Sequence, residues 1–298
     1  MRVGVMILPE RRWRESVLRW RAAERLGFDS AWTYDHLWWR SLRDEPWFSA
    51  IPLLAAVAAS TERIRFGTMV TSPNFRHPVV LAKDAITLDD ISGGRFALGV
   101  GAGSTGAGDA TVLGGEILSA PDRAARFSEF VALLDTLLEQ DVTSYQGRHF
   151  SAVEARMIPG CVQSPRLPLA IAATGPRGFD LAARHGDAWV TSGPADFSRS
   201  YTPDQFHAAV LAQVDGLQRA CARAGRDPAS IERILVTTDM TGDVLRSAEH
   251  FVTVAERYAK CGITHLVVHW PRENGVFAGD PNVLEDISRE ALLHVHSL

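Results

Sequence analysis

The chain has 298 residues, of which 46% are hydrophobic and 22% are charged, a composition typical of a folded protein with a large core and not of a disordered chain. The formal net charge of -4 provides no field that would attract nucleic acid or an anionic membrane surface. One α/β barrel can account for a chain of this length, so we expect residues 1–298 to form a single domain.

Short runs of β-branched and aliphatic residues alternate with longer segments of helical periodicity along the chain. Strands are expected at residues 2–8, 30–35, 64–71, 96–102, 167–173, 188–192, 234–239 and 264–269. Helices are expected at residues 14–26, 52–59, 79–91, 123–139, 178–184, 206–224, 248–260 and 283–296. Eight repeats of a strand followed by a helix predict an α/β fold, a closed (β/α)8 TIM barrel. An open, doubly wound sheet is the alternative that the same alternation allows.

One segment departs from this alternation, between the fourth helix and the fifth strand. Residues 141–165 contain alternating short runs around Tyr145–His149, a stretch with the composition of a turn. We therefore expect a hairpin insertion before the fifth strand.

The cysteines and the first residues indicate the compartment. Cys161, Cys221 and Cys261 are odd in number and far apart, which favours free thiols in a reducing cytoplasm over disulfides or a zinc site. The first apolar run, which ends at Pro9, is too short for a signal peptide, and no segment reaches the roughly 18 apolar residues that a membrane-spanning helix needs. We expect a cytoplasmic protein without membrane contact.

The residues that follow each strand are the candidates for chemistry, because such barrels carry their reacting groups at the carboxyl ends of the strands. Asp35 and His36 follow the second strand directly. A histidine oriented by a carboxylate can transfer a proton to or from a substrate oxygen near neutral pH. Spacing alone equally allows Asp35 to cap the next element and His36 to lie on the surface.

Two further loops are able to approach a flat ligand. Residues 67–78 are rich in hydroxyl groups and prolines and could wrap such a ligand, or could form an ordinary turn stiffened by proline. The glycines of residues 99–108 permit close approach of the backbone to a ring or a phosphate. That segment is neither a Rossmann fingerprint nor a P-loop, and a mobile loop explains its glycines equally well.

The fifth strand leads into Thr174–Gly178, directly before a helix. Free backbone amides at a helix start, with Arg177 beside them, would form an anion site suited to a cofactor phosphate. A tight turn that binds no phosphate is the alternative.

His265 and His269 lie four residues apart in one expected strand, hence on the same face, and together with His36 they raise the question of a metal site. Barrel hydrolases that bind metal usually take ligands from the first strand, and Val3–Leu8 offers none. We therefore expect no metal.

Taken together, these segments resemble the luciferase-like superfamily along nearly the whole chain, and within it the branch that uses the deazaflavin coenzyme F420. The resemblance rests on six segments in order, at residues 35–36, 71–78, 93–103, 171–178, 185–190 and 261–269. It implies F420, or alternatively FMN, with its ring against a bulge after the third strand. It also implies a small-molecule substrate and a homodimer, with a separate cofactor reductase as a further partner.

The resemblance places a non-proline cis peptide in that bulge, which by position is Met69–Val70. It gives proton transfer to His36, backed by Asp35, and a second catalytic position to Glu10, just after the first strand. The residues that it assigns to the cofactor are Asp35, Met69, Val70, Thr71, Ser72, Gly103, Ser104, Thr174, Gly175, Pro176, Arg177, Gly178 and Thr191.

The sequence also departs from the relatives that oxidise glucose 6-phosphate. They carry a glutamate at the position of Ser104 and a phosphate-binding lysine at that of Pro194, so this sugar phosphate is not the expected substrate. Trp38, Trp39 and Trp47 could instead line an apolar substrate pocket, although core packing or a dimer contact would use them equally well.

The expected activity is hydride transfer between F420 and a small, hydrophobic organic molecule. The alternative is an FMN-dependent monooxygenase that uses reduced flavin and oxygen, since both branches share the barrel and the cofactor site. A catalytically silent flavin-binding barrel is a third reading, because a fold does not guarantee an activity.

Overall fold

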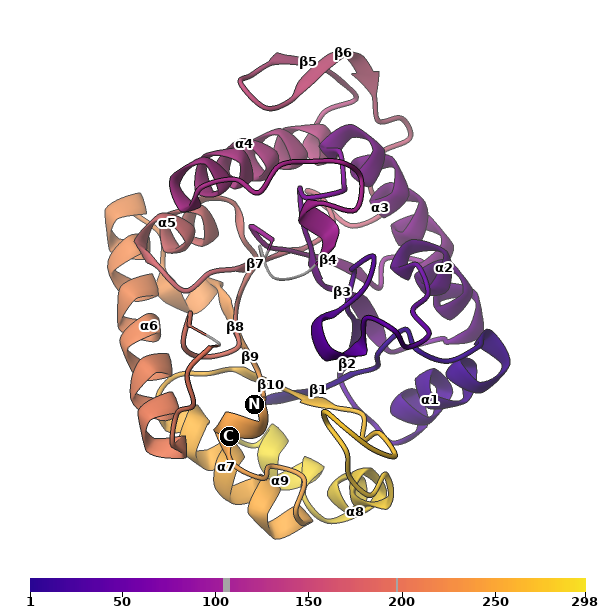
Figure 1. Cartoon of the computed structure of the whole chain (residues 1–298), viewed down its shortest axis with the longest axis vertical. Coiled ribbons are helices and arrows are strands. Elements are labelled where there is room, and N and C mark those ends of the chain that lie inside the picture. Colours follow the sequence, from indigo (N-terminus) through magenta and orange to yellow (C-terminus); the bar gives the residue numbers. More distant parts are fainter. Residues whose placement is uncertain (104–107, 197) are drawn as a thin grey trace. The chain divides into compact units, whose positions relative to one another are not determined.

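The computed structural model describes residues 1–103, 108–196 and 198–298. Within these ranges, eight parallel strands form a closed barrel in the order β1-β10-β9-β8-β7-β4-β3-β2, and helices alternate with them along the chain (Figure 1). The expected TIM barrel is confirmed, and the open sheet is wrong.

Every expected element is present, and most strands end earlier than expected because their last residues belong to the following loops. The barrel strands are β1 (Arg2–Met6), β2 (Ser30–Thr33), β3 (Arg65–Thr71), β4 (Phe96–Val100), β7 (Leu169–Ala172), β8 (Ala188–Thr191), β9 (Glu232–Val236) and β10 (His265–His269). The helices are α1 (Trp13–Arg25), α2 (Ala50–Ser60), α3 (Pro78–Ser92), α4 (Ala120–Glu139), α5 (Pro176–His185), α6 (Pro203–Ala224), α7 (Ala248–Lys260), α8 (Asn282–Glu290) and α9 (Leu292–His296). Among the helices in the described ranges, none combines the length and the apolar character needed to cross a bilayer.

The last expected helix is divided in two, which corrects the sequence-based prediction. Ala291, between α8 and α9, has a φ of -118°, outside the helical range. The break turns α9 towards the first residue of the chain, where the amine of Met1 donates a hydrogen bond to the carbonyl oxygen of Val295 at 2.8 Å. Helical periodicity continues across the break, so the pattern alone could not show it.

The chain divides into two compact units by its contacts. The first unit comprises Met1–Ile7, Arg19–Trp32 and Ala173–Leu298, and the second comprises Leu8–Leu18 and Thr33–Ala172. The first therefore contains β1, most of β2 and β8 to β10, and the second contains β3, β4, β7 and the insertion.

In the second unit, β3 and β4 pair closely through two glycines. A Cβ atom on Gly99 would lie 2.0 Å from the carbonyl oxygen of Thr68, and one on Gly101 would lie 2.7 Å from Cγ2 of Val70. The pairing shifts register between Thr68 and Thr71, as a bulge requires. Side chains at these two glycine positions would therefore push the strands apart.

The insertion is the expected hairpin, formed by β5 (Val142–Gln146) and β6 (Ser151–Arg156), which pair antiparallel. It lies beyond α4 in Figure 1. The carboxylate of Glu129, on α4, accepts hydrogen bonds from the backbone N–H of His149, 3.0 Å from both oxygens, and from that of Phe150 at 2.8 Å. A Cβ atom on Gly147 would lie 1.9 Å from the same carboxylate, so the turn closes around Glu129.

Candidate active site

Asp35 follows β2 and is only 1% exposed. Arg76 donates from Nη2 to Oδ1 at 2.8 Å and from Nε to Oδ2 at 3.0 Å, and Thr71 donates its hydroxyl to Oδ2 at 2.5 Å. Both carboxylate oxygens therefore accept hydrogen bonds from Thr71, at the end of β3, and Arg76, in the loop that follows. Asp35 fixes the loop after the bulge to the end of β2.

The partner of His36 is Asp109, not Asp35. Nδ1 of His36 shares a hydrogen bond with Oδ2 of Asp109, and the backbone N–H of Leu37 donates to Oδ1 of the same carboxylate at 2.6 Å. Asp109 lies in a short 3-10 helix, Gly108–Ala110, and is 1% exposed. The expectation that Asp35 orients His36 is wrong, because Arg76 and Thr71 occupy the oxygens of Asp35.

This pairing determines what His36 can do. A carboxylate can only accept, so Nδ1 of His36 carries a proton, and in the neutral imidazole the lone pair is on Nε2. Nε2 is then the atom able to take a proton from a ligand, and the imidazolium formed would be stabilised by Asp109. The indole of Trp47 donates to the carbonyl oxygen of His36 at 2.8 Å and so fixes the backbone as well.

The peptide bond between Met69 and Val70 is cis, as expected from the family resemblance. Gly99 of β4 and Gly101, directly after it, accommodate this bulge: Gly101 faces the side chain of Val70, and Gly99 faces Thr68. The interpretation that these glycines admit a ring or a phosphate is therefore wrong for Gly99 and Gly101. Next to the bulge, the hydroxyl of Ser72 is buried without a hydrogen-bond partner in the described part of the chain.

Gly103 and Ser104 were also assigned to the cofactor from the sequence. Gly103 has a φ of +79°, and a Cβ atom there would lie 2.5 Å from Nδ2 of Asn74. Asn74 in turn accepts a hydrogen bond from Arg126 of α4. Ser104 lies outside the described residues.

The three tryptophans assigned to the substrate are all partly exposed, and Trp47 is hydrogen-bonded to the carbonyl oxygen of His36. The indole of Trp38 covers Gly108, where a Cβ atom would be only 1.8 Å from the ring. Trp39 lies 5.4 Å from the ring of Tyr34, whose pKa is raised by burial. The contact of Trp38 with Gly108 therefore holds the loop after β2 against the segment that carries Asp109.

Glu10 lies in the turn after β1 and is partly exposed. Its neighbour Pro9 accepts a hydrogen bond from the backbone N–H of Phe48 at 2.7 Å. This contact brings the turn to the tryptophan-rich loop. The catalytic role of Glu10 stays a prediction.

In the first unit, α5 begins immediately after Gly175, which supplies no side-chain cap. Thr174, Pro176 and Arg177 are exposed, and nothing lies within 4 Å of a Cβ atom built on Gly175. The first amides of a helix have no partner within the helix, so this end is suited to an anion. Gly178 has a packing role, since its Cβ would lie 2.6 Å from that of Ala173.

Thr191 is buried at the end of β8. Its hydroxyl donates to Oε1 of Gln213 at 2.6 Å and accepts from the backbone N–H of Gly193 at 3.0 Å. The hydroxyl group is thus bound within the protein, and Thr191 shapes the loop that follows β8.

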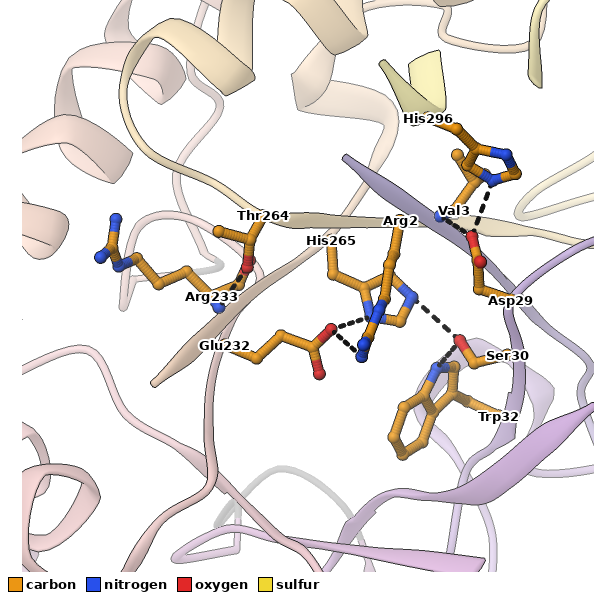
Figure 2. A network of polar contacts seen from close by, with 10 residues as sticks. All are labelled: Arg2, Val3, Asp29, Ser30, Trp32, Glu232, Arg233, Thr264, His265 and His296. Atoms are coloured by element: carbon orange, nitrogen blue, oxygen red, sulfur yellow. Dashed lines mark hydrogen bonds and ion pairs between the residues drawn. The ribbon is translucent and has the colours of Figure 1, made fainter. Parts of the chain in front are cut away.

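The histidines of β10 have separate surroundings. Figure 2 shows His265 in a chain of polar contacts, with Nε2 2.9 Å from Oγ of Ser30 and Nδ1 3.1 Å from Glu232. The indole of Trp32 donates to the same Ser30 hydroxyl at 2.7 Å. Although serine, histidine and glutamate follow one another as in a hydrolase, Ser30 is 2% exposed and inaccessible to a substrate. In the described ranges, no three His, Cys, Asp or Glu side chains are grouped to hold a metal.

Sequence reasoning missed Asp109, which lies 73 residues from its partner His36. The only local signal was an acid at the end of a glycine-rich segment after a barrel strand.

Comparisons with known proteins identify the family of the chain. The sequence profile of the family described as luciferase-like monooxygenase matches residues 1–250. The F420-dependent glucose-6-phosphate dehydrogenase of Beutenbergia cavernae is 32% identical over 292 residues, with 84% of this chain and 85% of that enzyme covered. The F420-dependent hydroxymycolic acid dehydrogenase of Mycobacterium tuberculosis is 32% identical over 246 residues, with 81% and 63% covered.

Solved structures share the fold. An F420-dependent secondary alcohol dehydrogenase in complex with an F420-acetone adduct has a TM-score of 0.81 at 21% identity, with 99% of this chain and 98% of that chain covered. The F420-dependent tetrahydromethanopterin reductase of Methanopyrus kandleri has a TM-score of 0.78 at 20% identity, with 99% of each chain covered. From the profile match and the dehydrogenase relatives together, the chain belongs to the luciferase-like monooxygenase family.

Proposed function

We propose that this protein is an F420-dependent oxidoreductase that transfers a hydride between the deazaflavin and a small, hydrophobic organic substrate. The observation that carries the proposal is the buried Asp109 behind His36, because it prepares Nε2 of His36 to exchange a proton with a substrate oxygen. The F420-dependent dehydrogenases among the relatives support the choice of cofactor.

The residues present fit such a cofactor. In the second unit, the bulge at Met69–Val70 and the buried hydroxyl of Ser72, which has no partner in the described residues, suit the edge of a polar ring. In the first unit, the amides that open α5, together with Arg177, suit an anionic group such as a phosphate. Thr71 and Thr191 support these sites from behind, through their hydrogen bonds to Asp35 and Gln213.

Bound F420 would supply the acceptor or donor of the hydride. In the oxidative direction, Nε2 of His36 takes the hydroxyl proton of an alcohol as the adjoining carbon loses its hydride, which leaves a carbonyl product. Asp109 stabilises the resulting imidazolium and keeps the ring in place. In the reductive direction His36 returns the proton to the carbonyl oxygen. Glu10 is a second group for proton exchange.

The substrate is a compact apolar alcohol or carbonyl compound in this proposal. Trp38, Trp39 and Trp47, in the loop that carries His36, have partly exposed indoles, which favour apolar contact. Pro194 is buried and carries no charge, so it offers nothing to a sugar phosphate.

We also propose that both compact units work as one domain, that the chain forms a homodimer and that it acts in the cytoplasm. The family profile spans residues of both units, which supports the single domain. Cys161, Cys221 and Cys261 are free thiols, which supports a reducing compartment.

A direct test is to titrate the purified protein with F420 and with FMN, following the fluorescence of each cofactor. We expect F420 to bind more tightly, and alcohol oxidation with F420 to require no oxygen. Tighter binding of FMN, with oxygen uptake in the presence of reduced FMN, would instead show a flavin monooxygenase. The variant His36→Asn should bind F420 as the parent does but lose turnover.

A further inference from the structure

An open cavity of about 500 Å³ lies at the amino ends of strands in the first compact unit, and every residue that lines it belongs to that unit. Its lining includes Arg2, the first residue of β1, Asp29, which precedes β2, and Thr264, which precedes β10. Arg233, the second residue of β9, and His296 of α9 also line it. Barrels of this kind carry their reacting groups at the carboxyl ends of the strands, so this cavity is separate from the candidate active site.

The guanidinium of Arg233 has no acidic partner among the described residues. Nη1 donates to the carbonyl oxygen of Gly262 and Nη2 to that of Pro228, both at 2.9 Å. Nε is buried and has no hydrogen-bond partner in the described part of the chain. A guanidinium has five N–H groups, so these two bonds to neutral carbonyls leave donors, and the positive charge, for a planar oxyanion.

The carboxylate of Asp29 is engaged through one oxygen. Oδ2 accepts from the backbone N–H of Val3 at 2.7 Å and lies 2.9 Å from Nε2 of His296. Oδ1 accepts no hydrogen bond from the residues that the structure describes, and the side chain is 31% exposed. The amine of Met1 lines the same cavity but donates to the carbonyl oxygen of Val295 at 2.8 Å. Asp29 therefore keeps an acceptor for a donor on a ligand.

Arg233 and Asp29 line the same cavity without forming an ion pair with each other. In Figure 2 they lie on opposite sides of Arg2. Arg2 pairs with Glu232 at 3.0 Å, and the same Glu232 oxygen lies 3.1 Å from Nδ1 of His265. The cavity thus presents a cation on one side and a carboxylate on the other, an arrangement complementary to a molecule that carries both charges.

We propose that this cavity binds a small zwitterion, an aminocarboxylate whose carboxylate is held by Arg233 and whose ammonium group is held by Asp29. Both contacts would be charge-assisted hydrogen bonds, which are stronger than neutral ones. The volume falls within the range of about 300–1,000 Å³ that small-molecule sites occupy. The inference goes beyond the proposed function and does not depend on it.

The test compares probes of equal chain length that carry one charge or both. The zwitterions 4-aminobutyrate and 6-aminohexanoate are each compared with the carboxylate and the amine of the same length. All are titrated into the purified protein without F420, and dissociation constants are measured by saturation-transfer NMR. At least one zwitterion should bind about tenfold or more tightly than both matching probes, because it alone makes both contacts. Equal affinity within each set, or no saturable binding of either zwitterion, overturns the inference.

Two variants assign the contacts. Arg233→Gln should weaken the tighter zwitterion by about tenfold or more and leave the matching amine unchanged. Asp29→Asn should weaken the same zwitterion by a similar factor and should not weaken the matching carboxylate. If both variants bind the zwitterion as the parent does, it binds elsewhere and the inference is wrong.

Arg223→Gln and Asp286→Asn are the matched controls. These residues belong to the exposed pairs Arg223–Asp180 and Asp286–Arg289, and neither lines the cavity. Their affinities should stay within twofold of the parent, and losses as large as those of the cavity variants would contradict the inference. If circular dichroism shows that Arg233→Gln does not fold, Arg233→Lys replaces it. That variant keeps the charge and loses the planar fork, so it should weaken the zwitterion and the carboxylate but not the amine.

Discussion

The guanidinium of Arg76 spans both carboxylate oxygens of Asp35, at 2.8 and 3.0 Å, and this pair joins the end of β2 to the loop after β3. Asp35 is almost fully buried, and Arg76 is its ion-pair partner. Arg76→Met should lower the free energy of unfolding by about 3–5 kcal/mol, because it leaves a carboxylate buried and unpaired.

Urea denaturation measures this loss. Arg223→Met is the control, since Arg223 pairs with Asp180 at 2.6 Å where both side chains are exposed. Solvent screens such a pair, and its loss should cost less than about 1 kcal/mol. Similar losses in both variants would contradict the role given to Arg76.

Asp109→Asn should separate the orientation of His36 from its presence. The backbone N–H of Leu37 needs an acceptor, so the asparagine oxygen should turn to Leu37 and its NH2 group to His36. Nδ1 of His36 must then accept, which moves the proton to Nε2, the atom that should receive the substrate proton. We expect kcat to fall by about 10²- to 10⁴-fold.

F420 affinity and the far-ultraviolet circular dichroism should be unchanged in Asp109→Asn. The nitrogen NMR shifts of the His36 ring report the tautomer directly. If the proton stays on Nδ1 while kcat falls, the loss has a different cause.

Gly99 in β4 and Gly101 directly after it should respond differently when Val70→Ala is added to an alanine substitution of the glycine. Gly101→Ala brings a Cβ atom to 2.7 Å from Cγ2 of Val70, and should destabilise the protein by about 1–3 kcal/mol. Val70→Ala removes the clashing methyl group, so the double variant should recover most of that loss.

Gly99→Ala meets the backbone oxygen of Thr68 at 2.0 Å, which no side-chain substitution removes. Adding Val70→Ala should therefore give no recovery. A double-mutant cycle from urea denaturation measures both couplings. If Val70→Ala restored the free energy of unfolding equally at Gly99 and Gly101, its effect at Gly101 would not come from removing the clash with Cγ2 of Val70.

His269 should make the protein less stable in acid. Its pKa falls from the ordinary value of 6.5 to about 3 on folding, so between these values the unfolded chain binds a proton that the folded chain refuses. The stabilisation is complete above pH 6.5 and is lost as the pH falls towards 3, at up to about 1.4 kcal/mol per pH unit.

The ring of Phe277 stacks on that of His269, with the centroids 3.5 Å apart. His269→Phe keeps a flat ring in this stack and removes the titrating group. Its free energy of unfolding, from urea denaturation across this range, should fall less steeply on acidification than that of the parent. Parallel curves would show that His269 does not carry this dependence.

Local patterns predicted the fold well, because each strand and helix of a barrel is a contiguous segment with its own periodicity. The break at Ala291 escaped, since residues on both sides keep the helical pattern. At the candidate site, the motif after β2 pointed to His36, and the family resemblance placed the cis peptide at Met69–Val70. Asp109 was not found, because it is 73 residues from His36 in the sequence. The two side chains meet only when the loop after β2 packs against the 3-10 helix Gly108–Ala110.

The glycines of β4 show a related limit. A glycine in a sequence reveals that a side chain is missing, but not which neighbour fills the space. Here Val70 and Thr68 fill it, where a ligand was an equally good reading.

The hairpin is fastened to α4 by a carboxylate that binds only main-chain N–H groups, those of His149 and Phe150. Every residue except proline has a main-chain N–H group, so these hydrogen bonds do not depend on the side chains of His149 and Phe150. The arms of the hairpin are thus free to lengthen or change composition over evolutionary time, provided that Glu129 and a turn of the same backbone shape persist. The insertion is a place where new surfaces can be added to the barrel without altering the helix beneath.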